Sequence, residues 1–399
     1  MSKRGARPSH SSGVSFQTKP ILTIVSGHFA HDVYTAFIAP LLPLLMRKLS
    51  LSLTQSGALA AAIQLPSILS PFIGYLADRI NLRYFVILAP AVTATLMSML
   101  GLASSYPTLL LLLLICGISV AAFHAPAPAM ISRLSGDRVG KGMSFFMAAG
   151  ELGRTLGPLL AVWAVSMWTL QGFFRVVVLG WAASLFLFIQ LRAVPARTDK
   201  PAGFREMLPK AWRLFGPLLW ILLLRNFLLS SIGVYLPTFM TLGGANLWVA
   251  GGALSVFEIA GVFGALLSGT LSDLIGRKPV LMTGLVAAPL LTLIFLEVEG
   301  PWRVAVLLAL GFTGLSTGPV MLAIVQEHLP SHRALANGLF LSMVFLTRPP
   351  GVVIAGLIGD HWGLETTFTC AAIACLMAVP AVMLLPSLDG FGTSQSNES

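Results

Sequence analysis

The chain has 399 residues, of which 56% are hydrophobic and 10% are charged, and its formal net charge is +10. Soluble domains carry about 25% charged residues, so a soluble fold is excluded for most of this chain. The three cysteines lie in apolar runs and match no CxxC or Cys/His spacing, which argues against a zinc centre.

Residues 1–19 form a polar, basic tail without the apolar stretch of a signal peptide. Twelve apolar segments follow, each close to or above the roughly 20 residues that cross a bilayer. They are predicted to be helices, because lipid cannot satisfy free backbone groups and the alternation of barrel strands is missing. The predicted spans are 20–46, 53–77, 84–104, 108–132, 140–168, 173–192, 214–241, 246–272, 279–297, 302–327, 334–359 and 364–385.

A polar stretch with three prolines and six basic residues runs from Arg192 to Arg213. It predicts a linker at 194–213 between two six-helix bundles, 20–193 and 214–386, and residues 387–399 form a polar tail. With the N-terminus inside, 18 Lys and Arg residues lie on the side of the termini and 4 on the other. This predicts an inner-membrane protein with both termini in the cytoplasm, and it explains the net charge without a nucleic-acid partner.

The two bundles are related by an internal repeat at an offset of 194–195 residues. A repeat of this kind is typical of transporters, whose binding sites lie near mid-membrane between the repeats. The matched positions are Pro43 and Pro237, Gln64 and Glu258, Asp78 and Asp273, Gly117 and Gly311, Arg154 and Arg348, and His31-Asp32 and Arg225-Asn226.

One short motif occurs in both repeats, at the end of the second span of each bundle. Its aspartates are predicted to act as conformational latches, each capping the N-terminus of a helix of the other bundle, with Arg79 or Arg83 as the pairing partner on the same loop. Its glycines are predicted to permit close helix packing. The latch residues are Gly74, Asp78, Arg79 and Arg83 in the first copy and Gly269, Asp273 and Arg277 in the second.

These motifs resemble those of the major facilitator superfamily, and the Gly/Pro-rich segment 150–158 is similar to its antiporter motif. Within that superfamily, Gly27–Asp32 and Phe123-His124 resemble the fosmidomycin-resistance branch. The resemblance implies a twelve-helix fold in two pseudo-symmetric halves and proton-driven drug efflux by alternating access. It also implies a monomer that handles protons and a small molecule in the lipid bilayer.

Several ionisable residues lie within predicted spans, where a charge costs at least about 2.5–3.5 kcal/mol and therefore indicates function. His28 and Asp32 are one helical turn apart, and a histidine can share a proton with a carboxylate. We expect Asp32, with His28 and Glu151, to couple transport to protons; the alternative is a structural ion pair. Glu151 and Arg154 either neutralise each other, or Glu151 exchanges partners as it titrates.

Arg154 and its repeat mate Arg348 are predicted to clamp an anion, since guanidinium binds carboxylate or phosphate through two hydrogen bonds. Arg225 either faces the substrate or pairs with Asp32. His124 and Glu258 are either structural or ligands of the cavity. The predicted substrate-binding residues are Arg154, Arg348, Arg225, Asn226, His124, Glu258 and His31.

The sequence shows no nucleotide-binding loop, metal-ligand pattern or nucleophile–base set, so no cofactor, metal or enzyme activity is expected. The leading interpretation is a proton-coupled exporter of a small anionic or amphiphilic compound. The first alternative is an importer or exchanger of an organic acid, phosphate ester or sugar. The second is a receptor or scaffold that no longer transports.

Overall fold

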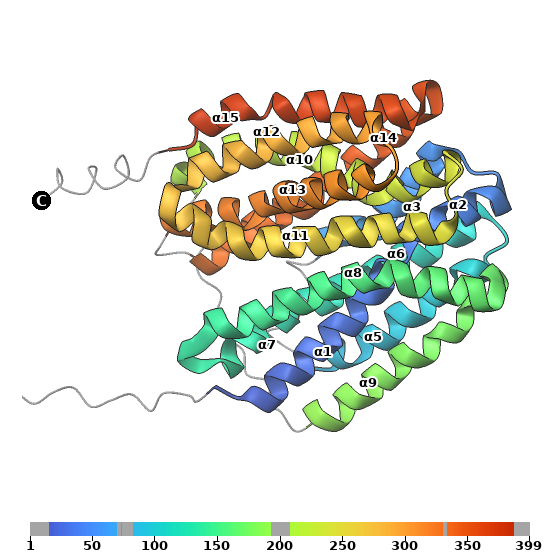
Figure 1. Ribbon diagram of the computed structural model, residues 1–399. Helices are drawn as coiled ribbons and strands as arrows, with labels where there is room; N and C mark the ends of the chain where they lie inside the picture. Colours follow the sequence, from blue (N-terminus) through green and yellow to red (C-terminus); the bar gives the residue numbers. More distant parts are fainter. Residues whose placement is uncertain (1–15, 70–72, 74–82, 193–207, 330–332, 387–399) are drawn as a thin grey trace, which may run out of the picture.

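The computed structural model describes residues 16–69, 73, 83–192, 208–329 and 333–386. Figure 1 shows two helical bundles, with the N-terminal half below and the C-terminal half above. The N-terminal half contains α1 (Thr18–Thr35), α2 (Ile38–Leu49), α3 (Leu53–Ala62), η1 (Leu65–Leu69), α5 (Arg83–Ser98), η2 (Met99–Leu102), α6 (Tyr106–His124), α7 (Pro126–Leu134), η3 (Gly136–Arg138), α8 (Val139–Gly172), η4 (Phe173–Val176) and α9 (Val177–Leu191). The C-terminal half contains α10 (Leu208–Leu242), α11 (Leu247–Ile275), α12 (Arg277–Glu297), α13 (Pro301–His328), α14 (Arg333–Leu376) and α15 (Val379–Met383).

Nine stretches of the described residues are long and apolar enough to cross a membrane. Two of them each hold two predicted spans, and the backbone bends at Thr169 (φ 62°) in one and at Gly363 (φ 84°) in the other. The predicted span 53–77 is described only over α3, η1 and residue 73. The all-helical membrane fold is confirmed, and the full count of twelve spans stays a prediction.

Prolines divide two of the predicted spans. α1 ends at Thr35 and α2 begins at Ile38, two residues before Pro40, which cannot donate to the carbonyl of Ala36. α6 ends at His124 and α7 begins at Pro126 for the same reason. The break after His124 places this histidine at a helix end within the membrane-spanning part of the chain.

The internal repeat is visible in the packing. Within the N-terminal half α1 packs on α8, and within the C-terminal half α10 packs on α14 in the same way. Between the halves, the contact of α3 with α14 corresponds to that of α11 with α8. A Cβ added at Gly117 would lie 2.5 Å from the carbonyl oxygen of Ile63, and one at Gly311 would lie 2.1 Å from that of Phe257. Both glycines and both carbonyls are 194 residues apart, so the pseudo-symmetric halves are confirmed at the level of single contacts.

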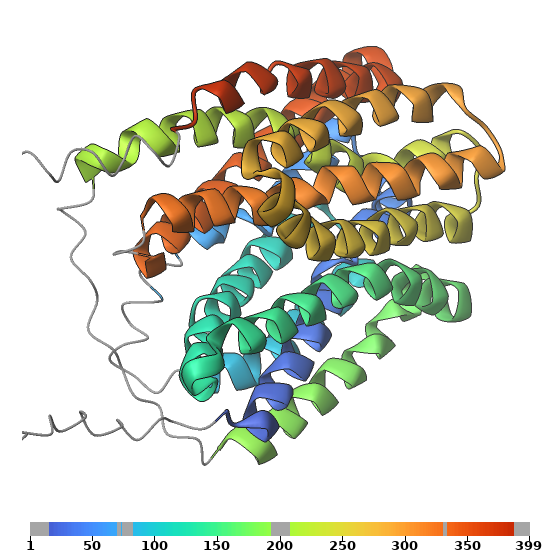
Figure 2. The same cartoon turned by 60° about the vertical axis from the view of Figure 1, so that its left-hand side comes forward.

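The starts of α1 and α10 and the ends of α9 and α15 lie on one side in both views (Figures 1 and 2). One hydrophobic core runs through both halves, and its members toward the opposite side include Leu41, Leu53 and Val352. A separate smaller core, with Ile24, Phe123 and Leu191, occupies the N-terminal half near the termini. We call the side away from the termini the outer end; it is where the halves share a core.

Candidate functional site

The polar cluster of the N-terminal half is built on one face of α1. His28, His31 and Asp32 are 4%, 0% and 3% exposed, although they lie in a membrane-spanning helix. Phe146 of α8 stacks on the ring of His28 at 3.8 Å between centroids, and Phe123 of α6 stacks on that of His31 at 4.6 Å. The aromatic contacts hold both imidazoles in place around the carboxylate.

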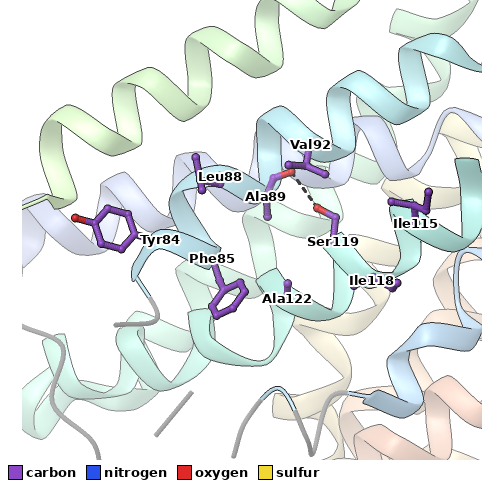
Figure 3. Close-up of a pocket in the computed structure, with 9 residues that line it drawn as sticks. All are labelled: Tyr84, Phe85, Leu88, Ala89, Val92, Ile115, Ile118, Ser119 and Ala122. Atoms are coloured by element: carbon purple, nitrogen blue, oxygen red, sulfur yellow. Dashed lines mark hydrogen bonds between the residues drawn. The ribbon is translucent and has the colours of Figure 1, made fainter. Parts of the chain in front are cut away.

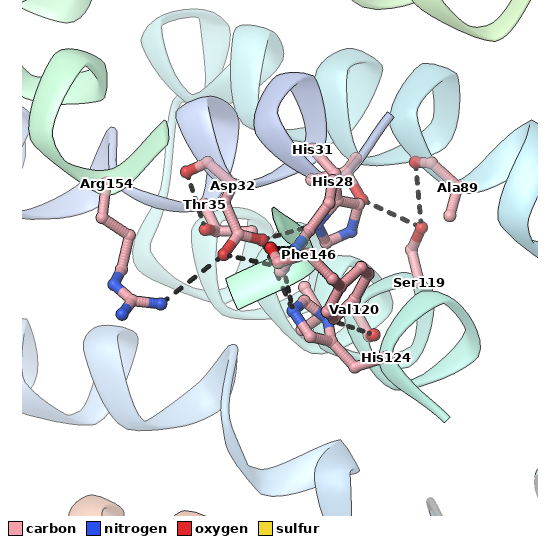
Figure 4. Close-up of polar contacts among 11 residues, drawn as sticks. His28, His31, Asp32, Thr35, Ala89, Ser119, Val120, His124, Phe146 and Arg154 are labelled. Atoms are coloured by element: carbon pink, nitrogen blue, oxygen red, sulfur yellow. Dashed lines mark hydrogen bonds and ion pairs between the residues drawn. The ribbon is translucent and has the colours of Figure 1, made fainter. Parts of the chain in front are cut away.

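Asp32 is the centre of this cluster (Figure 4). Its Oδ2 lies 3.4 Å from Nε2 of His28 and 3.6 Å from Nη1 of Arg154. Its Oδ1 lies 3.1 Å from Nδ1 of His31 and 3.5 Å from Nε2 of His124. The carboxylate therefore has four basic neighbours from three helices. Arg225 is not among its ion-pair partners in the described structure, so the predicted Arg225–Asp32 alternative is wrong for this conformation.

His124 of α6 contacts His28 of α1. The two Nε2 atoms are 3.2 Å apart. Each Nδ1 lies near a backbone carbonyl, at 2.7 Å from Phe146 O for His28 and 3.1 Å from Val120 O for His124. A carbonyl only accepts, so both Nδ1 atoms carry hydrogen and donate. Two neutral rings would then present lone pairs to each other, and a cation between the Nε2 atoms removes this repulsion.

A chain of hydroxyl groups extends the cluster away from α8. Thr93 Oγ1 lies 3.2 Å from Nε2 of His31 and donates to Ser119 Oγ at 2.9 Å. Ser119 in turn donates to the carbonyl of Ala89 at 3.3 Å. Sequence reasoning missed Thr93 and Ser119, because a single hydroxyl in an apolar span is common and its partners lie on other helices.

In the antiporter-like segment of α8, glycines are needed because α1 lies too close for any larger side chain. A Cβ added at Gly150 would lie 2.5 Å from Cε1 of His28, and one at Gly153 would lie 2.7 Å from the carbonyl oxygen of Phe29. At Gly157 it would lie 2.6 Å from the carbonyl oxygen of Val33. The stripe brings the backbone of α8 against the polar face of α1, which places Arg154 beside Asp32.

Arg154 connects the polar cluster to a second group of charges. It forms an ion pair with Glu151, one turn earlier on α8, and its side chain is 38% exposed while that of Asp32 is 4% exposed. The charges of Glu258 on α11 and Arg348 on α14 act on it across the interface between the halves. The four predicted residues Glu151, Arg154, Glu258 and Arg348 thus come together in one electrostatic group.

Arg225 and Asn226 form a separate buried network in the C-terminal half. The guanidinium donates to Thr317 Oγ1, to Asn226 Oδ1 at 3.0 Å and to the carbonyl of Gly314 at 3.2 Å. Asn226 donates to Thr347 Oγ1 at 2.7 Å. Because these contacts use Nε, Nη1 and Nη2 of Arg225, its interactions fit anchoring of α10 on α13 and α14 better than the predicted contact with substrate.

The second latch motif is centred on Arg277. This guanidinium contacts Asp273 Oδ1 at 2.5 Å and Glu327 Oε1 at 2.7 Å, and it donates to Ser272 Oγ at 2.5 Å. These contacts join α11, α12 and α13 within one half, and Asp273 has no ion pair with a described residue of the other half. A Cβ at Gly269 would meet no heavy atom of the described chain within 4 Å, so the described residues do not form the close packing predicted there.

In the first copy, Gly74, Asp78 and Arg79 lie outside the described residues. Arg83 begins α5, and its guanidinium carbon lies 5.2 Å from the centroid of the Tyr84 ring. The latch role of this copy stays a prediction.

Asp360, which the sequence did not single out, joins the halves at the outer end. Its carboxylate at the bend of α14 accepts from the backbone N–H groups of Leu53 at 2.7 Å and Thr54 at 2.9 Å. These are orphan donors of the first turn of α3, so Asp360 caps a helix of the other half. Tyr235 of α10 adds a second link, since its hydroxyl donates to the carbonyl of Leu53 at 2.8 Å.

Replacing Asp360 by asparagine is expected to open the outer end more often, because a neutral amide supplies one acceptor instead of two charged ones. A cap contributes about 1 kcal/mol, which predicts about a fivefold shift toward the open state. Spin labels at R47C and W362C would report the separation of the halves. An unchanged distance distribution would contradict this role of Asp360.

A pocket of about 500 Å³ lies between α5 and α6 (Figure 3). Its wall is largely apolar, with Phe85, Leu88, Val92 and Ile115, and its hydroxyl-bearing residues are Tyr84 and Ser119. Such a lining does not suit a charged substrate, so the pocket is distinct from the arginine group.

Comparison with known proteins identifies the family of this chain. The sequence profile described as Major Facilitator Superfamily matches residues 24–347 and, in an overlapping second match, residues 244–398. The chain is 26% identical over 371 residues to the fosmidomycin resistance protein of Escherichia coli (strain K12), covering 90% of both chains. It is also 26% identical over 392 residues to the multidrug resistance protein MdtG of Enterobacter lignolyticus (strain SCF1), covering 92% of both.

Solved structures show the same fold. A bacterial homolog of the human lysosomal transporter Spinster, in an inward-facing and occupied conformation, has a TM-score of 0.82 at 15% identity, covering 98% of this chain and 99% of that one. A D-xylose–proton symporter has a TM-score of 0.75 at 17% identity, covering 94% and 99%. Likeness at these identities concerns the fold alone.

Proposed function

The chain belongs to the major facilitator superfamily of multi-pass membrane transporters, which are not enzymes, and we propose that it is a proton-coupled antiporter. It would export a small anionic or amphiphilic compound through the cell membrane by alternating access, as a monomer with both termini in the cytoplasm. Two relatives are named for resistance to fosmidomycin and to multiple drugs, which supports the outward direction.

The buried carboxylate of Asp32 among three histidines is the observation that carries proton coupling. In a membrane-spanning helix, such a group needs a counter-charge or a proton. Four basic neighbours can stabilise its charge, and His31 leads from it to the hydroxyl chain. Asp32 and His28 therefore remain the proposed coupling residues, and His124 moves from the substrate set to theirs.

The arginine group supports an anionic substrate. Arg154 and Arg348 belong to different halves, and their positive charges repel each other. An anion placed between them would relieve this repulsion and link the halves. Guanidinium groups bind carboxylate and phosphonate oxygens in pairs. Glu151 and Glu258 neutralise the arginines when no anion is present, and each loses this role when substrate binds.

The contact of Arg154 with Asp32 favours a second candidate, anion–proton symport. An anion that draws Arg154 away removes a counter-charge from Asp32, and the carboxylate then takes up a proton more readily. Binding of the anion would then favour binding of the proton, and the reverse, as a symporter that imports its substrate requires. Antiport requires the opposite sign, so substrate must displace the proton.

Purified protein in liposomes with an internal pH dye tests these alternatives, using fosmidomycin and a panel of organic anions. Protons that move opposite to the anion support export by antiport, and protons that move with it support symport. Anion flux without proton movement would refute coupling in either direction.

R154A and R348A are each expected to weaken transport of the anion by about 10- to 100-fold, since a hydrogen bond to a charged group contributes about 1.5–3 kcal/mol. R175A removes an exposed arginine of η4 and serves as the matched control. Anion transport that is equal in all three variants would refute the clamp.

A further inference from the structure

We propose that His28, Asp32 and His124 form a binding site for a divalent transition metal ion of the zinc type, with a fourth coordination position open. Their ligand atoms all lie within 4.8 Å of one another. The sequence shows no metal-binding spacing because His124 is supplied by α6, far along the chain from the other two residues on α1.

The shortest separations are close to those of tetrahedral coordination, with the two histidines facing different oxygens of Asp32. Bonds of about 2.0–2.1 Å in a tetrahedron place neighbouring ligand atoms about 3.3 Å apart. The observed distances are 3.2 Å between the two Nε2 atoms, 3.4 Å from His28 Nε2 to Asp32 Oδ2 and 3.5 Å from His124 Nε2 to Asp32 Oδ1. An ion held by the two Nε2 atoms would take one or both oxygens of Asp32, with rotation of its carboxylate.

The hydrogen bonds made by Nδ1 of His28 and of His124 are those typical of metal-binding histidines. Metal-ligating imidazoles usually donate their other N–H to a carbonyl or carboxylate, which leaves a lone pair directed at the ion. His28 donates from Nδ1 to Phe146 O, and His124 donates from Nδ1 to Val120 O. Both Nε2 atoms consequently keep a lone pair, and they lie 3.2 Å apart beside Asp32.

The charges and access also suit such an ion. Asp32 supplies one negative charge, and Glu151 offsets the positive charge of Arg154, which lies 3.6 Å from Asp32. His124 is the most accessible ligand, with 25% of its side chain exposed, so an ion and a fourth ligand can enter there. Two imidazoles and one carboxylate favour Zn²⁺ and Co²⁺ over the oxygen-preferring Mg²⁺ and Ca²⁺. A bound ion would tie α1 to α6 and block the groups proposed to carry protons.

The test uses the purified full-length protein with a histidine-free tag, stripped with EDTA and titrated with Co²⁺, whose visible spectrum reports its geometry. We expect one Co²⁺ per chain with tetrahedral bands that Zn²⁺ abolishes by displacement. Loss of a residue that hydrogen-bonds a metal ligand typically weakens metal binding 10- to 100-fold. H28Q and H124Q each remove a ligand itself, so each should weaken Co²⁺ binding by more than this. H361Q removes an exposed histidine of α14 and should bind like the unaltered protein.

H124C keeps a metal-ligating side chain, and we expect it to retain the ion and to add a sulfur-to-cobalt charge-transfer band. This variant separates loss of a ligand from loss of the fold. Absence of Co²⁺ and Zn²⁺ binding, or binding in H28Q and H124Q that is as tight as in the unaltered protein, would overturn the metal site. A shared proton would then be the cation between the rings, and the liposome result on anion transport would stand unaffected.

Discussion

Replacing Asp32 by asparagine is expected to abolish transport against a gradient while leaving exchange of substrate down its gradient. Asparagine keeps the shape of the side chain and an oxygen that can accept from His31, but it cannot take up or release a proton. Without coupling, a proton gradient should no longer drive accumulation, and the ratio of substrate across the membrane should fall to about one. Liposomes with an imposed pH gradient measure this ratio directly.

E365Q is the matched control, because it removes an exposed carboxylate of α14 without touching the cluster. We expect it to accumulate substrate like the unaltered protein. If D32N also accumulated substrate normally, Asp32 would be a structural partner of His28, His31 and Arg154, as the alternative interpretation of the sequence holds. Loss of both uphill transport and downhill exchange would indicate instead that the carboxylate is needed for the fold or for binding.

Replacing Gly57 by valine is expected to keep the outer end from closing. A Cβ there would lie 2.3 Å from the hydroxyl oxygen of Tyr235 and 2.7 Å from the carbonyl oxygen of Val352. The tyrosine can rotate, but the carbonyl belongs to the backbone of α14, so the halves must separate. Overpacking costs about 1–3 kcal/mol, which predicts a shift of about 5- to 150-fold toward the open state. Spin labels at R47C and W362C measure the separation, and transport should fall in proportion.

G252V tests whether the effect is specific, because a Cβ at Gly252 of α11 would have no described heavy atom within 4 Å. We expect this variant to close and to transport normally. A G57V protein with an unchanged distance distribution would contradict the tight contact between α3 and α14. Together with D360N, the pair distinguishes steric opening of the outer end from loss of the Asp360 cap.

Sequence periodicity predicted most of the fold, because each signal is local. Long apolar runs require helices in lipid, and prolines and glycines mark where those helices break or approach one another. The offset of 194 residues related Gly117 to Gly311, and both glycines contact a carbonyl at the same relative position. The role of the glycines in segment 150–158 was also predictable, since their spacing places them on one face of α8.

The partners of the ionisable residues were not predictable in this way. The sequence indicated that Asp32, Arg154 and Arg348 carry function, because charges in a membrane are costly. It did not show that His124 faces His28, that Arg225 is bound by Thr317 and Gly314, or that Asp360 caps α3. It also did not show that Asp273, expected to latch the two halves, pairs with Arg277 of its own half, which in turn pairs with Glu327.

The sequence by itself determined that this is a duplicated helical membrane protein with costly charges at defined points along its helices. Tertiary structure alone decided which of those charges meet, because α1, α6 and α8 each supply a different part of the cluster around Asp32. The physical reason is that an electrostatic contact depends on distances of a few ångströms between helices, and the helical period of one segment does not specify how it is rotated against another.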